Sequence, residues 1–154
     1  MARRYPQLAL DEQLCFALYS AFHAMMRTYR PLLAEADLTY PQYLTMLALW
    51  ERPEETVSVG DLGRRLRLDS GTLTPLLKRL EAAGHLTRRR DPDDERRVLV
   101  EVSEGGLALR DRVASVPASL AACVGADVAA AARLRSELRA LADTLDPEPR
   151  LRAG

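Results

Sequence analysis

The chain has 154 residues, of which 47% are hydrophobic and 5% aromatic, and its formal net charge is zero. This length suits one domain with a moderate core, and the composition favours Leu/Ala-rich helices over a β-sandwich. No run approaches the roughly 18 apolar residues of a membrane span, and the first residues lack the apolar stretch of a secretory signal. We therefore expect a cytoplasmic protein whose thiols are reduced at rest.

The cysteines and histidines argue against a metal centre. Cys15 and Cys123 are far apart and lack Cys-x-x-Cys spacing, and the only histidines are His23 and His85. A structural zinc site needs four such ligands at characteristic spacings. The sequence therefore predicts no metal site, and nothing in it indicates a cofactor.

The first predicted helix spans residues 11–29, because apolar side chains recur there at helical spacing. Cys15 lies in its second turn, where the backbone dipoles near a helix N-terminus favour a thiolate. The neighbouring carboxylates of Asp11 and Glu12 oppose that ionisation. Pro31 is expected either to kink this helix or to open a short second helix through residue 36. The apolar positions are Leu14, Leu18, Phe22, Met25 and Met26.

Residues 39–102 predict a helix-turn-helix followed by a wing. Thr39 is expected to cap a helix, and two further helices are predicted over residues 59–66 and 72–83. Gly84 then ends the second of these, as glycine commonly does after a helix C-terminus.

Two strands are predicted next, over residues 85–90 and 97–102, joined by a polar hairpin tip. The segment from residue 64 to 90 holds eight basic and two acidic residues, a net charge of +6 that suits contact with phosphates. We therefore expect residues 39–102 to form a DNA-binding lobe, and the alternative is a small module that binds protein.

The candidate DNA contacts lie on the second helix of this motif and at the wing tip. The outward positions of the helix are polar, whereas its leucines face inward. Arg96 at the hairpin tip suits the minor groove, which attracts arginine, and Asp94 is expected to hold its guanidinium. The candidate residues on the helix are Ser70, Thr72, Thr74, Lys78 and Arg79.

The C-terminal part, residues 103–146, is predicted to be helical with an interruption near Pro117. Apolar residues alternate there at intervals of four and three, which requires a partner helix. An intramolecular partner is possible in principle, but we favour a homodimer formed by residues 1–36 and 103–146. The seam consists of Leu120, Val124, Asp127, Ala131, Leu134, Leu138, Leu141 and Leu145.

These residues carry a resemblance to a known family. The segment Ser70-Gly71-Thr72-Leu73-Thr74-Pro75-Leu76-Leu77-Lys78-Arg79-Leu80-Glu81, with Gly84, the wing Asp94-Glu95-Arg96 and Val102-Ser103-Glu104-Gly105-Gly106, resembles the MarR family of bacterial winged-helix repressors. Cys15 together with Tyr29 and Tyr40 resembles its organic hydroperoxide resistance regulator subgroup. The resemblance covers residues 11–145. It implies a mainly α fold with a small β-wing, and a homodimer that binds a pseudo-palindromic double-stranded DNA operator.

The resemblance also implies a chemistry for Cys15. A thiolate attacks a peroxide and becomes a sulfenic acid, and phenolic hydroxyls stabilise the thiolate by donating hydrogen bonds. Tyr19 lies one turn from Cys15, but Tyr29 is about 21 Å further along the helix and cannot reach it within one subunit. The subgroup implies a network across two subunits, with Tyr40 as its third member. The apolar residues around Cys15 are expected to form a pocket that favours organic hydroperoxides.

Cys123 has two interpretations. It is either a small core residue or, as the two-cysteine type of the subgroup implies, the thiol that forms a disulfide with Cys15 of the other subunit. We therefore predict a repressor that releases its operator when organic hydroperoxides oxidise Cys15. Three alternatives are a repressor induced by a phenolic or aromatic ligand, a thiol peroxidase, and an architectural DNA-binding protein. The peroxidase is disfavoured, because no arginine lies beside Cys15 to polarise a peroxide, and we expect no enzyme activity.

Overall fold

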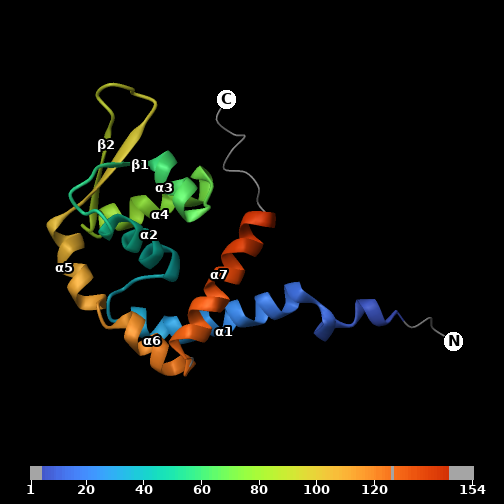
Figure 1. Cartoon of the computed structure of the whole chain (residues 1–154). Coiled ribbons are helices and arrows are strands. Elements are labelled where there is room, and N and C mark those ends of the chain that lie inside the picture. The colour runs from blue at the N-terminus through green and yellow to red at the C-terminus, as the bar shows by residue number, and fades with distance from the viewer. Residues whose placement is uncertain (1–4, 126, 146–154) are drawn as a thin grey trace.

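The structure is a computed structural model that describes residues 5–125 and 127–145. It is mainly helical with one small antiparallel sheet, which confirms the predicted fold class (Figure 1). The ends of the predicted dimerisation segments, residues 1–4 and 146, lie outside the described residues. The helices are α1 (Leu14–Ala34), α2 (Tyr40–Trp50), α3 (Val59–Leu66), α4 (Ser70–Ala82), α5 (Glu104–Val113), α6 (Val116–Val124) and α7 (Val128–Leu145).

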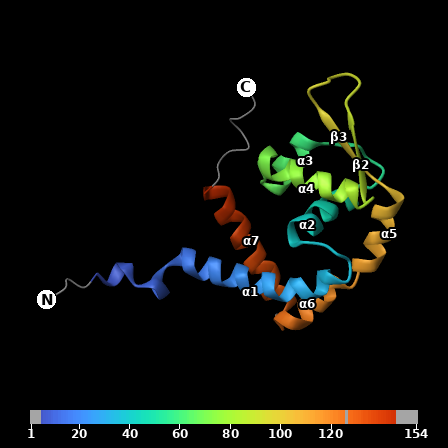
Figure 2. The ribbon, with the colours of Figure 1, turned by 180° about the vertical axis from the view of Figure 1, so that it is seen from behind.

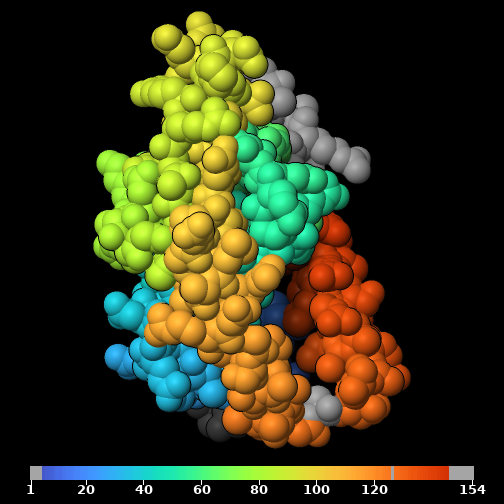
Figure 3. All heavy atoms as spheres, turned by 90° about the vertical axis from the view of Figure 1, so that its left-hand side faces the viewer, coloured from blue at the N-terminus to red at the C-terminus, as the bar shows by residue number. Residues whose placement is uncertain are grey.

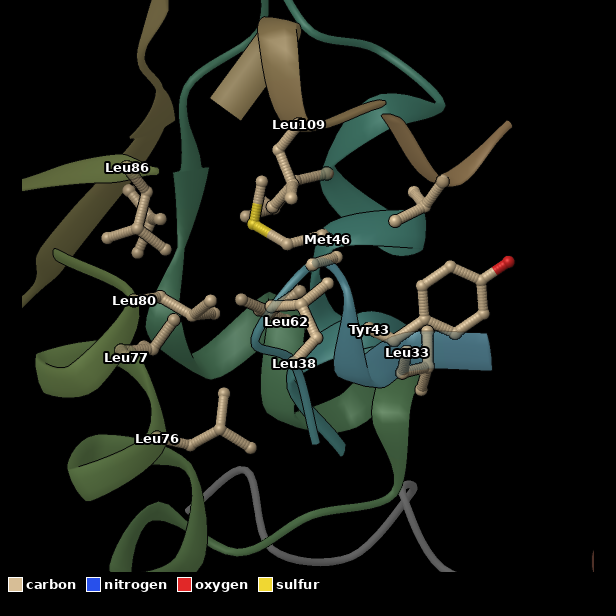
Figure 4. Close-up of a cluster of buried hydrophobic side chains, with 14 of the residues drawn as sticks. Leu33, Leu38, Tyr43, Met46, Leu62, Leu76, Leu77, Leu80, Leu86 and Leu109 are labelled. Carbon is tan, nitrogen blue, oxygen red and sulfur yellow. The ribbon is translucent and has the colours of Figure 1, made fainter. Parts of the chain in front are cut away.

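A single cluster of buried residues holds the winged lobe to the end of α1. Leu33 enters this cluster from α1, Met46 from α2, and Leu109 from α5 (Figure 4). Four leucines on one face of α4 complete it, because their spacing places them on the same side of the helix. These are Leu73, Leu76, Leu77 and Leu80.

Helix α1 begins at Leu14, three residues later than the sequence suggested. Gln13 takes an extended backbone conformation, and its side-chain amide donates hydrogen bonds to the carbonyl oxygens of Gln7 and Ala9, at 2.8 and 3.0 Å. The residues before it form two 3-10 turns, Pro6–Leu8 and Leu10–Glu12. Cys15 therefore lies in the first turn of the helix rather than in its second.

Pro31 lies inside α1, so of the two alternatives at this proline the separate short helix through residue 36 is not formed. The helix continues to Ala34. Beyond Pro31, its last turn is anchored by the side chain of Leu33, which packs in the core and is only 1% exposed. Asp37 then takes a left-handed conformation with φ of 54°. The burial of this last turn thus offsets the loss of the backbone hydrogen bond that proline cannot donate.

The observed helix-turn-helix agrees closely with the one predicted from the sequence. Ser58 caps α3, as its Oγ accepts a hydrogen bond from the backbone N–H of Asp61 at 3.1 Å. Asp69 caps α4, as its Oδ1 accepts one from the N–H of Thr72 at 2.8 Å. Because Asp69 is the cap, α4 begins two residues before the predicted start. Gly84 follows this helix with φ of +78°, a conformation that glycine adopts without strain.

The wing is a hairpin of β2 (Leu86–Arg90) and β3 (Val98–Val102), close to the predicted strands. A further strand, β1 (Val57–Ser58), pairs with β3 opposite Val100 and Leu99, which gives the order β1-β3-β2. The sequence did not indicate β1, because two residues are too few to show an alternating pattern.

The C-terminal seam does not run along one helix. Gly125 ends α6 with φ of +60°, and a separate helix, α7, begins at Val128. The apolar repeat thus crosses a break, and the expectation of a continuous seam is wrong. On α7, Leu134 is 56% exposed, and the helix stands apart from α5 across an open hollow (Figure 3). Val128, Leu138 and Leu145 are also exposed, whereas Leu141 is partly buried within the subunit.

Within residues 5–125 and 127–145, no single helix is long and apolar enough to cross a membrane. One bent pair of helical stretches has the length and apolar composition of a membrane span only when the two are taken together. These stretches are Glu104–Val124 and Val128–Leu145.

Candidate nucleic-acid interface and thiol site

The outer face of α4 carries the residues that the sequence assigned to DNA. Ser70, Thr72, Lys78 and Arg79 are exposed, and Thr74 is partly buried. The leucines on the opposite face fix the helix in the core, so its polar face is held outward. The wing projects from the same end of the molecule as α3 and α4 (Figures 1 and 2). The lobe therefore presents a helix and a hairpin together, as winged DNA-binding domains do.

Most of the local positive charge is neutralised within the chain. Five of the eight basic residues between residues 64 and 90 form ion pairs with carboxylates. Among the described residues, the other three, Lys78, Arg79 and Arg90, have no carboxylate oxygen within 4.0 Å, and neither does Arg96 at the wing tip. The net charge of +6 therefore overstates the cations that are free for phosphate. The pairs are Arg64–Asp61, Arg65–Glu51, Arg67–Asp143, Arg88–Glu81 and Arg89–Glu101.

Asp94 shapes the wing tip through the backbone. Its Oδ1 accepts a hydrogen bond from the backbone N–H of Arg96 at 3.1 Å, and its carbonyl oxygen accepts one from the N–H of Arg97 at 2.9 Å. Asp94 thus contacts the main chain of Arg96, where the sequence suggested a contact with the guanidinium. The Arg96 side chain is exposed.

Tyr29 and Tyr40 lie together within one subunit, whereas the network with Cys15 that the family resemblance implied spans two subunits and stays a prediction. Their ring centroids lie 4.7 Å apart, because the end of α1 packs against the first turn of α2. Tyr43 joins them at 6.0 Å from Tyr29, and its ring lies at the edge of the core with its hydroxyl directed away (Figure 4). Sequence reasoning missed Tyr43, although its position one turn after Tyr40 places both on one helix face.

Cys15 lies at the other end of α1, in a segment that projects from the body of the subunit (Figures 1 and 2). Cys15 is exposed, as are Leu14 and Phe22, the latter at 53%, whereas Leu18 is partly buried. The apolar pocket expected around Cys15 is therefore not formed within one subunit. Tyr19 packs its ring against His23, with centroids 4.2 Å apart. Fourteen residues of helix, about 21 Å, separate Cys15 from Tyr29.

Cys123 is exposed near the end of α6, and both cysteines are free. Helix α6 packs on the C-terminal part of α1, where Leu32 and Val116 line a shared hollow. Cys15 is at the opposite, N-terminal end of α1. The structure therefore does not bring the two thiols of one subunit together.

A cavity of about 540 Å³ lies between α1, α2 and α4. Tyr29 and Tyr40 line it, together with Arg30 of α1 and Arg79 of α4. Arg79 is a candidate DNA contact on α4 and also borders the tyrosine pair. This cavity was not indicated by the sequence, because its wall comes from three separate helices. Among the described residues, no group of three or more His, Cys, Asp or Glu side chains is arranged to hold a metal ion.

We expect Tyr29 to be the last tyrosine to ionise. Burial, and then the neighbouring phenols of Tyr40 and Tyr43, raise the pKa of Tyr29 from 10.0 to about 12. Because the folded state keeps this proton where the unfolded state loses it, the stability present below pH 10.0 falls as the pH rises toward about 12. Phenolate absorbance during a pH titration should show a late phase that Tyr29→Phe removes. A late phase that survives Tyr29→Phe contradicts this assignment.

Comparison with known proteins places these features in a family. The model of the SarA/Rot transcriptional regulators matches residues 27–113, which include the tyrosine pair, the helix-turn-helix and the wing. The HTH-type transcriptional regulator TtmR of Methylorubrum extorquens is 50% identical over 89% of this chain and 66% of that protein, just under two thirds of its length. The organic hydroperoxide resistance transcriptional regulator of Bacillus subtilis is 41% identical over 94% of this chain and 97% of that protein.

Solved structures of AbfR, a Staphylococcus epidermidis protein, share the fold. Reduced AbfR bound to DNA matches with a TM-score of 0.77 and 32% identity, over 90% of this chain and 94% of that chain. The overoxidized form bound to DNA gives 0.74 and 31%, over 91% and 97%. The disulfide form gives 0.60 and 32%, over 90% and 91%. The chain therefore belongs to the MarR/SarA family of winged-helix, DNA-binding transcriptional regulators, which are not enzymes.

Proposed function

We propose that this regulator is a homodimeric repressor that binds a pseudo-palindromic operator while Cys15 is reduced and releases it when an organic hydroperoxide oxidises Cys15. The observation that carries the proposal is the position of Cys15. It is an exposed thiol on a projecting apolar segment of α1, at the opposite end of that helix from the Tyr29–Tyr40 pair. An antiparallel crossing of two α1 helices would bring each thiol to the phenols of the other subunit.

The dimer is supported by apolar surface that one subunit leaves exposed. On α1 this includes Leu14 and Phe22, and on α7 it includes Leu134 and Leu138. Extended apolar surface of this kind marks an interface, because burying it removes it from water. In this proposal residues 1–36 and 103–146 form the dimer, and residues 39–102 form the DNA-binding lobe. A second α1 would also complete the apolar pocket around Cys15 that one subunit lacks.

The proposed reaction consumes one hydroperoxide for each Cys15. The thiolate attacks one peroxide oxygen, the O–O bond breaks, and the departing alkoxide takes a proton to become an alcohol. The resulting sulfenic acid is attacked by the Cys123 thiolate of the other subunit, which forms a disulfide and releases water. The charged sulfur that accepts phenolic hydrogen bonds is then lost. Because Tyr40 is the first residue of α2, a shift of the tyrosine pair moves the lobe.

The relatives support this reaction. One is named for organic hydroperoxide resistance, and AbfR has been solved reduced on DNA and in a disulfide form. Overoxidized AbfR has also been solved on DNA, so the amount of oxidant matters in any test. One molar equivalent of hydroperoxide should yield a dimer that is crosslinked on non-reducing electrophoresis and restored by dithiothreitol. Cys123→Ser should abolish the crosslink, and a crosslink that persists in this variant would exclude Cys123 as the resolving thiol.

A second candidate function is supported by the cavity beside the tyrosine pair. Its phenols and the guanidinium groups of Arg30 and Arg79, which outnumber the one carboxylate in the lining, Asp37, suit an aromatic carboxylate or phenolate. Since Arg79 lies on α4, such a ligand would act directly on the DNA-facing helix. Induction of Cys15→Ser by salicylate, with loss of that induction on Arg30→Ala, would favour this function over peroxide sensing.

A further inference from the structure

Asp61 connects the helix-turn-helix to the wing. It lies in the first turn of α3, where the Ser58 hydroxyl donates a hydrogen bond to its Oδ2 at 2.5 Å. Its Oδ1 accepts a hydrogen bond from the guanidinium of Arg64. The same carboxylate faces Arg97 of the wing, whose Nη2 lies 3.8 Å from Oδ2. One side chain thus contacts the helix cap, the next turn of α3 and the wing.

Arg97 is attached to the hairpin as well as to α3. Its Nε lies 3.8 Å from Oδ2 of Asp91, and its carbonyl oxygen accepts a hydrogen bond from the N–H of Asp91 at 3.0 Å. Arg97 directly follows Arg96 in the chain. A change in how Arg97 is held therefore changes the position of the Arg96 backbone at the wing tip.

The two arginines share a hollow of about 440 Å³ between α3, α4 and the wing, which Arg64 and Arg88 also line. Asp61 is the acidic residue in that lining, so it separates guanidinium groups that otherwise repel one another. The hydrogen bond from Ser58, followed by the charge of Arg64, lowers the pKa of Asp61 and keeps it ionised at neutral pH. Arg88 is paired with Glu81, whereas Arg96 keeps no carboxylate partner among the described residues.

We propose that Asp61 is a positioning residue for DNA recognition, which holds Arg97 against α3 and thereby directs the unpaired Arg96 side chain to the DNA. The carboxylate itself does not touch DNA. This role is independent of Cys15, because it concerns the reduced protein and the base of the wing. It can therefore fail or hold without affecting the proposed peroxide response.

Electrostatics alone and positioning predict opposite results for Asp61→Asn. Removing a negative charge near DNA strengthens binding to any sequence, because fewer charges repel the phosphates. Loss of positioning weakens binding to the operator in particular. We therefore expect the ratio of operator affinity to random-DNA affinity to fall by about tenfold, part of the effect of losing an arginine contact. The asparagine side chain keeps an acceptor for Ser58, so the α3 cap is retained.

The experiment uses the reduced full-length protein without peroxide and measures both affinities by fluorescence anisotropy. Glu51→Gln is the matched control, since it also breaks a surface pair with an arginine of α3 but does not touch the wing. Arg97→Gln should lower the ratio like Asp61→Asn, and the double variant should fall no further than the single ones. The proposal is overturned if Asp61→Asn changes the affinity ratio no more than Glu51→Gln does. It is also overturned if the effects of Asp61→Asn and Arg97→Gln on that ratio are additive in the double variant.

Discussion

Replacing Cys15 with serine should leave operator binding intact and remove its response to organic hydroperoxide. For the unchanged protein, one equivalent of cumene hydroperoxide should weaken operator binding by roughly 5- to 150-fold, the usual range of coupling between two sites. A serine hydroxyl has no oxidisable sulfur, so the variant should keep the reduced-state affinity throughout. Anisotropy titration against operator DNA, before and after peroxide, measures both quantities.

Cys123→Ser provides the matched control for this experiment, because it removes the other exposed thiol and leaves the proposed sensor. It should still form a sulfenic acid at Cys15, which a dimedone-type probe detects by mass spectrometry. If Cys15→Ser remains fully inducible by peroxide, the proposed sensor is wrong, and the regulator keeps only its DNA-binding role.

Gly106→Ala should destabilise the fold by about 1–3 kcal/mol, as overpacking of a filled site does. A methyl group at this position would overlap the carbonyl oxygen of His85 and lie 2.9 Å from Cγ1 of Val102. The carbonyl oxygen of Gly106 also accepts a hydrogen bond from Nε1 of Trp50 at 2.9 Å. Backbone at this point joins α5, α2 and the base of the wing, so no one element can move aside alone.

Thermal unfolding tests this expectation, and each kcal/mol corresponds to a shift of about 2–4 °C for a chain of this size. Gly60→Ala is the matched control, because a methyl there meets only ordinary contacts at 3.8 Å on the exposed side of α3. It should raise stability by up to about 1 kcal/mol, since alanine favours a helix over glycine. Equal melting temperatures for the two variants would show that the wing base yields more readily than its contacts indicate.

The sequence anticipated the parts of the fold that local patterns determine. The four inward leucines of α4, the glycine after it and the alternating valines of β3 each follow one element's period, and the structure has all three. The start of α1 was misplaced because one extended residue, Gln13, interrupts an otherwise helical pattern. The prediction of a continuous seam near Gly125 was wrong for the opposite reason, because the apolar repeat continues across the end of a helix.

The candidate site was anticipated less completely, because its geometry depends on contacts between distant segments. Tyr29 and Tyr40 were named from the family resemblance and lie together, but Tyr43 and the cavity beside them required the packing of several helices. The ion pairs were out of reach for the same reason, since Arg67 finds its carboxylate at Asp143 on α7. Charge counting along the chain cannot assign such partners.

The ion pairs between arginines and carboxylates inside the subunit affect how the regulator finds its operator among the other sequences of a genome. Because five of the eight basic residues between residues 64 and 90 are paired with carboxylates, we expect the lobe to bind arbitrary chromosomal sequence weakly, since counterion release scales with the phosphates that a protein neutralises. We therefore expect its preference for the operator to depend chiefly on DNA shape and on contacts to base edges, made by α4 and the wing tip.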